Sequence, residues 1–147
     1  MILEDQKQDI SRIFSALSDE AALFAYKEDK WTLKEVLGHL TDVERIMSYR
    51  ALRIARKDKT PLPGFDENEY VFNAGFNGRT VKDLLNEFIF VRNSTISFVN
   101  SLSPEVCTYT GFVNDNVISV SALMFIITGH TIHHMDIIND RYLSQNP

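Results

Sequence analysis

The last long helix of the chain is predicted from residues 120–138, which read VSALMFIITGHTIHHMDII. Apolar residues and histidines recur there at the spacing that places side chains on one face of an α-helix. That face carries Leu123, Ile127, His130, His134 and Ile137. Three of the four histidines of the chain fall in this stretch. We therefore expect a helical core with imidazoles built into it.

Three segments upstream have the same helical period. They cover residues 4–17, 32–57 and 80–102. The second segment opens with a capping box, in which the Thr32 hydroxyl accepts from the Glu35 amide and the Glu35 carboxylate reaches back. Each segment has an apolar stripe, so each helix is expected to turn one face toward a shared core.

The connections between these helices follow from their turn-forming residues. A short helix or a packed loop is expected after Asp66, and residues 107–117 are expected to form a loop with short extended pieces. Ser119 or Ser121 caps the last helix, which should run to about residue 143. The sequence thus predicts an all-α fold, a four-helix bundle with long connections after the second and third helices.

Bulk composition limits the class of protein. A chain of 147 residues with 44% hydrophobic residues fits one domain, residues 1–147. The net charge of −5 argues against nucleic acid as a partner, because phosphates require a basic face. The most apolar run, residues 122–128, is too short to span a bilayer, and the N-terminus does not resemble a signal peptide. The single cysteine, Cys107, suits a reducing compartment, so we expect a soluble cytoplasmic protein without a membrane partner.

The histidine spacing allows two interpretations. His130 and His134 lie one helical turn apart on the same face, whereas His133 lies about 100° from His134 and cannot easily share an ion with it. Thr131 follows the first histidine, which excludes the zincin motif, where glutamate stands at that position. The pair either binds a metal ion or consists of core histidines that bond to backbone or carboxylate groups. Spacing alone leaves both open.

A charged pair is the second feature with two interpretations. Glu44 and Arg92 lie on the flanks of the apolar stripes of the second and third helices. They can form a buried ion pair across these helices. Alternatively, the Arg92 stem packs against the core while its guanidinium group reaches water.

Several motifs together resemble the DinB/YfiT superfamily. They are Trp31–Arg50, which contains His39, then Pro61–Asp66, Gly129–His134 and Arg141–Leu143. The resemblance covers about residues 28–143. It implies a four-helix bundle, often a homodimer. It also implies that His39 from the second helix joins His130 and His134 from the last helix around a divalent ion, while His133 stays outside.

The resemblance further implies an enzyme. Three neutral imidazoles leave open coordination positions, which is the pattern of catalytic metal sites, and nitrogen ligands suit zinc, nickel, copper or iron. The expected activity is a thiol-dependent transferase, with a low-molecular-weight thiol as cosubstrate, or a hydrolase acting on a small molecule. Asp42 and Glu35 are candidate catalytic groups only because they neighbour His39 on its helix. The alternative is a non-catalytic dimeric helical module with a structural or vestigial metal site.

Overall fold

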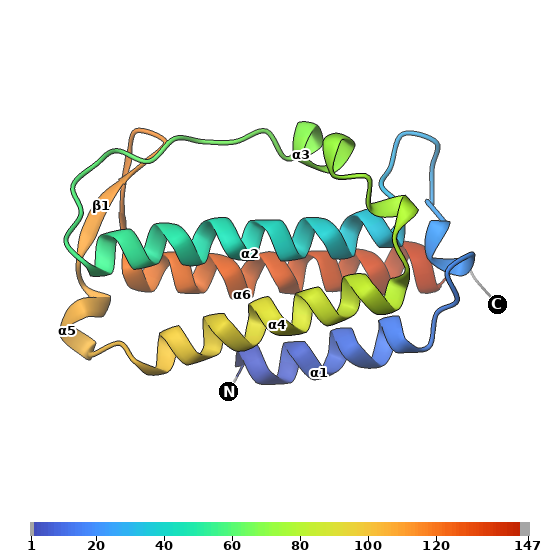
Figure 1. Ribbon diagram of the computed structural model, residues 1–147, viewed down its shortest axis with the longest axis horizontal. Coiled ribbons are helices and arrows are strands. Elements are labelled where there is room, and N and C mark those ends of the chain that lie inside the picture. Colours follow the sequence, from blue (N-terminus) through green and yellow to red (C-terminus); the bar gives the residue numbers. More distant parts are fainter. Residues whose placement is uncertain (1, 145–147) are drawn as a thin grey trace.

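Four long helices form an elongated bundle in the computed structural model, which describes residues 2–144 (Figure 1). The elements of the described chain are α1 (Ile2–Ser15), a 3-10 turn (Ala21–Leu23), α2 (Leu33–Ala55), α3 (Glu67–Ala74), a 3-10 turn (Phe76–Gly78), α4 (Val81–Asn100), α5 (Pro104–Cys107), β1 (Thr110–Val113), β2 (Asn116–Ser119), α6 (Val120–Ile137) and a π-helical turn (Ile138–Leu143). The all-α four-helix prediction is confirmed.

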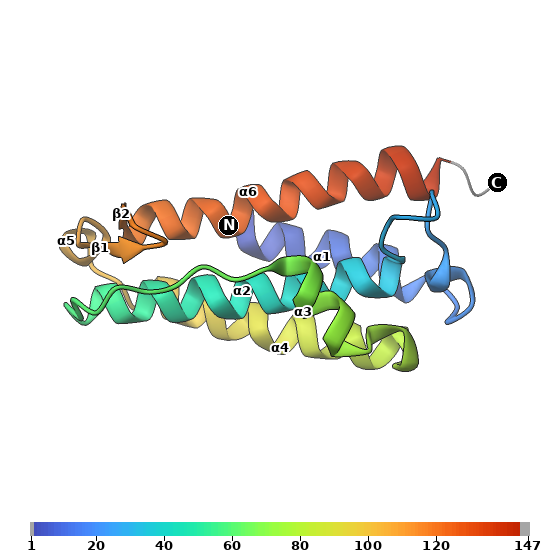
Figure 2. The ribbon, with the colours of Figure 1, turned by 90° about the horizontal axis from the view of Figure 1, so that it is seen from above.

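The long connections set the direction of the helices. Helix α2 packs against α4 and α6, and α1 packs against the same two helices. In both ribbon views α2 and α4 run in one direction, while α1 and α6 run in the other (Figures 1 and 2). The two parallel helices need a connection that returns along the bundle, and α3 lies in that connection. As a result, α3 lies over the N-terminal half of α2 (Figure 1).

Local sequence signals place the helix ends. Thr32 Oγ1 accepts from the Glu35 amide at 3.2 Å while the Thr32 amide donates to the Glu35 carboxylate at 2.8 Å, so the predicted capping box is present. Thr80 caps α4, and Ser119 rather than Ser121 caps α6. These side chains satisfy amide groups that the first helical turn leaves without partners.

The segment before α6 is more regular than expected. The expected short extended pieces are the strands β1 and β2, which pair as an antiparallel hairpin, and the one-turn helix α5 precedes them. Asn114 and Asp115 have positive φ at the hairpin turn, a conformation that these residue types adopt more readily than most. The Leu62 amide donates to the Phe112 carbonyl at 3.0 Å and the Asn114 amide donates to the Leu62 carbonyl at 2.9 Å. These bonds attach the long connection after α2 to the hairpin.

Glu44 and Arg92 form the buried ion pair, which decides between the two sequence interpretations. Arg92 Nε donates to both Glu44 carboxylate oxygens at 2.9 Å, and the two side chains are 2% and 0% exposed, respectively, for Glu44 and Arg92. Arg92 also donates to the Leu3 carbonyl, to Gln6 and to the Thr131 hydroxyl. The guanidinium group therefore joins all four long helices.

Within residues 2–144, no helix combines the length and the apolar character that crossing a membrane requires.

Candidate metal centre

Three histidines from two antiparallel helices meet inside the bundle. His39 comes from α2, and His130 and His134 come from successive turns of α6. His39 Nε2 lies 3.0 Å from His130 Nε2, and one nitrogen from each of the three rings lies within 4.8 Å of the others. Two nitrogens bound to one ion at tetrahedral geometry stand about 3.4 Å apart, so the nitrogen separations in this cluster approach those of a shared ion. His133 is exposed and lies outside this cluster.

Burial keeps these imidazoles neutral. His39 is 2% exposed and His134 is 9% exposed. Burial, reinforced by the neighbouring histidines, lowers the pKa of His39 to about 3. The same causes lower the pKa of His130 and that of His134 to about 4. At neutral pH each ring keeps a free lone pair, which is the form that binds metal ions.

Aromatic packing fixes the histidine rings. The Trp31 ring lies 4.6 Å from the His39 ring and 6.4 Å from the His134 ring, measured between centroids. The backbone carbonyl of Trp31 accepts a hydrogen bond of 2.6 Å from the Tyr142 hydroxyl, in the π-helical turn after α6. Trp31 therefore fixes the start of α2 to the end of α6, beside the three histidines.

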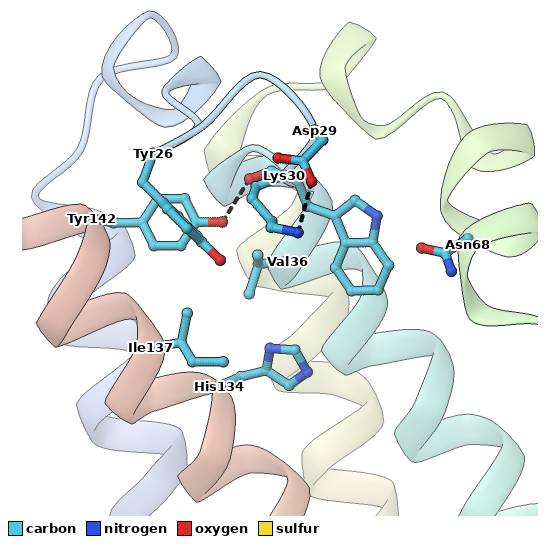
Figure 3. A pocket seen from close by; sticks show the side chains of 9 residues that line it. Tyr26, Asp29, Lys30, Val36, Asn68, His134, Ile137 and Tyr142 are labelled. Atoms are coloured by element: carbon cyan, nitrogen blue, oxygen red, sulfur yellow. Dashed lines mark hydrogen bonds and ion pairs between the residues drawn. The ribbon is translucent and has the colours of Figure 1, made fainter.

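A cavity of about 210 Å³ opens beside His134 (Figure 3). It is lined by Tyr26, Asp29, Lys30, Trp31, Val36, Asn68, His134, Ile137 and Tyr142. Lys30 and Asp29 neutralise each other through an ion pair of 2.9 Å, drawn as a dashed line in Figure 3. The remaining walls are mainly aromatic and aliphatic. The histidine cluster thus adjoins a space that a small molecule can enter.

Glu67 is a site residue that the sequence analysis missed. It is the first residue of α3, its side chain is 56% exposed, and its Oε2 lies 3.6 Å from His39 Nε2. The sequence predicts a short helix or a packed loop after Asp66, and the structure has the helix. Spacing along the chain could not reveal that the connection returns over α2 and brings this carboxylate to His39.

Glu35 and Asp42, the candidate catalytic groups, are engaged elsewhere. The Glu35 carboxylate accepts from the Thr32 amide and from Asn77 Nδ2, at 2.8 and 3.0 Å. Asp42 lies 3.5 Å from Arg45 Nη1, and burial raises the pKa of its carboxyl group. Within residues 2–144, no hydrogen bond or ion pair joins either carboxylate to a histidine. Their catalytic role stays a prediction.

Comparison with known proteins gives the family. The sequence profile of the DinB superfamily matches residues 2–138. The chain belongs to the DinB superfamily. YfiT from Bacillus subtilis has a similar solved structure, described as that of a probable metal-dependent hydrolase with an unusual four-helix bundle topology.

The similarity to YfiT has a TM-score of 0.82 with 15% sequence identity, and it covers 95% of this DinB-superfamily chain and 81% of YfiT. At this identity the likeness concerns the fold alone. No curated protein matches the chain.

Proposed function

We propose that this DinB-superfamily protein is a divalent-metal-dependent enzyme in which His39, His130 and His134 hold the ion. The observation that carries the proposal is the meeting of three neutral imidazole nitrogens within 4.8 Å of one another. Three protein ligands leave at least one coordination position for water or substrate, as in catalytic sites. The cavity beside His134 supports this use, because a purely structural site needs no adjoining space.

The chain offers residues for each part of a metal-assisted reaction. A bound divalent ion lowers the pKa of a water or a thiol and polarises a carbonyl group. Glu67 is the carboxylate placed to accept the proton of that nucleophile, since its Oε2 is 3.6 Å from a ligand nitrogen and open to solvent. Trp31 and Ile137 line the cavity and give it apolar walls. In this scheme a hydrolase uses water as the nucleophile, whereas a thiol transferase uses a thiol.

The cavity also limits the substrate. Its volume of about 210 Å³ accommodates a small molecule or one group of it. The aromatic rings of Tyr26, Trp31 and Tyr142 favour a planar or apolar group, with polar contact available from Asn68. Nitrogen ligands favour zinc, nickel or iron as the ion. The assembly that we propose is a homodimer formed through the outer face of α6.

A metal-dependent activity screen tests the proposal. Chelator-stripped protein, and the same protein reloaded with zinc or nickel, are assayed on chromogenic esters and amides, and on electrophiles with a small thiol. We expect turnover in one of these assays that disappears on stripping and returns on reloading. His133→Ala is the matched control for His130→Ala and should keep the activity that His130→Ala loses. Fully loaded protein with no turnover in either assay would favour the non-catalytic module.

A further inference from the structure

Arg50 is a buried cation in the half of the bundle that lies away from the three histidines. It lies in α2 and is 6% exposed. Among residues 2–144, no carboxylate lies within ion-pair distance of its guanidinium group. A buried charge without a counter-charge is costly, and proteins rarely keep one unless it is used. Arg92, the other buried arginine of the described bundle, has Glu44 as its partner.

The protein uses only part of the hydrogen-bonding capacity of Arg50. Nη2 donates to the Pro63 carbonyl at 2.6 Å, and Nη1 makes a weak contact of 3.6 Å with the Met47 sulfur. The Phe65 ring lies 5.5 Å from the guanidinium carbon. A guanidinium group has five N–H donors in a fixed plane. Among residues 2–144, Arg50 Nε makes no hydrogen bond, and because no buried side-chain nitrogen or oxygen of the described chain lacks a partner, this donor is accessible to solvent.

A cavity of about 200 Å³ adjoins this guanidinium group. Its lining is Ile46, Tyr49, Arg50, Leu62, Pro63, Gly64, Phe65 and Tyr70. Tyr49 and Tyr70 are 51% and 47% exposed, so they form the outer part of the cavity, whereas Arg50 lies at its inner end. The arrangement places unused, solvent-accessible donors of one cation at a cavity with aromatic walls.

We propose that this cavity binds the oxyanion of a small ligand, a carboxylate or a phosphate, through the Arg50 guanidinium group. The planar donor group of arginine matches both oxyanions and forms two parallel hydrogen bonds with either. Tyr49, Phe65 and Tyr70 provide faces for an apolar or aromatic ligand body. The site is separate from the metal centre. His39 precedes Arg50 by eleven residues of α2, about 16 Å along the helix axis, and no histidine lines the cavity.

The site can be tested directly on the arginine side chain by NMR. Zinc-loaded protein is titrated with inorganic phosphate and, separately, with acetate at constant ionic strength, while the arginine Nε–H signals are followed. The Arg50 signal is identified by its loss in Arg50→Lys. We expect the Arg50 signal to shift saturably with at least one anion. The anion that saturates the shift at the lower concentration shows whether the site prefers phosphate or carboxylate. A signal that stays fixed, or that follows added chloride equally well, overturns the proposal.

Three variants distinguish anion binding at Arg50 from anion binding elsewhere on the protein. Arg50→Met should weaken anion binding by about tenfold or more, the loss expected for hydrogen bonds to a charged group. Arg56→Met removes an exposed arginine of the same helix end and should change nothing. His130→Ala should preserve the Arg50 shift, and its loss there would mean that the anion binds at the metal centre instead. If Arg50→Met does not fold, the wild-type titration and His130→Ala still decide the question.

Discussion

At the scale of single residues, the lowered histidine pKa values have a consequence for stability. The unfolded chain takes up protons on its histidines near pH 6.5, whereas the folded pKa values are about 3 for His39 and about 4 for His130 and His134. Between these pH limits the unfolded state binds more protons than the folded state. The contribution of the neutral histidines to the free energy of unfolding is therefore fully present above pH 6.5 and is lost as the pH falls toward 4 and 3. Each histidine contributes up to about 1.4 kcal/mol per pH unit.

Thermal unfolding of metal-free protein at pH 7, 6 and 5 measures this effect. We expect the melting temperature to fall with pH, and the dependence to be shallower in His39→Gln. His133→Gln is the control, because it leaves His39, His130 and His134 in place, and it should keep nearly the wild-type dependence. Equal stability at pH 7 and pH 5 would contradict the burial of neutral imidazoles.

The Glu44–Arg92 pair gives a prediction for folding. Glu44 belongs to α2 and Thr131 to α6, and Arg92 binds both. Arg92 therefore holds the two helices that carry the histidines in position relative to each other. Arg92→Ala leaves the Glu44 carboxylate buried without a counter-charge, which costs about 3–5 kcal/mol. Urea unfolding measures this loss. Arg45→Ala, which breaks a partly exposed pair with Glu87, should cost less than about 1 kcal/mol. Equal losses for both variants would contradict this assignment.

At the scale of elements, α3 is a short helix held mainly by Val71, its one buried residue. Asp66 caps its first turn and Gly75, with φ of 65°, ends it. Helix α3 nevertheless supplies one residue to the histidine cluster and one to each of the two cavities. Glu67 approaches His39, Asn68 lines the cavity beside His134, and Tyr70 lines the cavity at Arg50.

Glu67→Gln tests the contribution of α3 to the reaction. Loss of this carboxylate, the proton acceptor that we propose, should lower turnover by about 10²–10⁴-fold while metal content stays unchanged. Glu69→Gln removes a charge from the same helix without touching a histidine and should behave as wild type. Wild-type turnover in Glu67→Gln would show that the carboxylate is not the acceptor. Loss of the ion in that variant would make Glu67 a ligand.

The elements also differ in how far the sequence could predict them. Helices and their caps follow from residues three or four positions apart, so Thr32, Thr80 and the face shared by His130 and His134 were predictable. The approach of His39 joins positions ninety-one residues apart, and only the family resemblance indicated it. The approach of Glu67 depends on the path of a long connection, for which local spacing carries no signal.

At the scale of the whole molecule, α6 is apolar on its outer face as well as its inner one. Phe125 is 75% exposed and Ile132 is 49% exposed. Between them, Gly129 faces open space where a side chain would otherwise stand. A helix with exposed apolar side chains on its outer face is normally covered there by another protein surface.

We expect two copies of the chain to cover this face of α6. Light scattering at roughly tens of micromolar protein should give twice the chain mass of 16.9 kDa. Phe125→Glu should shift the protein toward monomer, because dimerisation would then bury a charge. Phe72→Glu, at an exposed phenylalanine on α3, should leave the dimer intact. A wild-type protein that is monomeric under these conditions would refute the assembly.

The metal content of four single variants tests the three-histidine centre most directly. His39→Ala, His130→Ala, His133→Ala and His134→Ala are purified without a histidine tag, supplied with zinc or nickel at neutral pH, and analysed by elemental mass spectrometry. Wild type and His133→Ala should each carry one ion per chain, and the other three variants should lose most of it. Loss in His133→Ala with retention in His130→Ala, or a wild type that takes up no metal, would contradict the account.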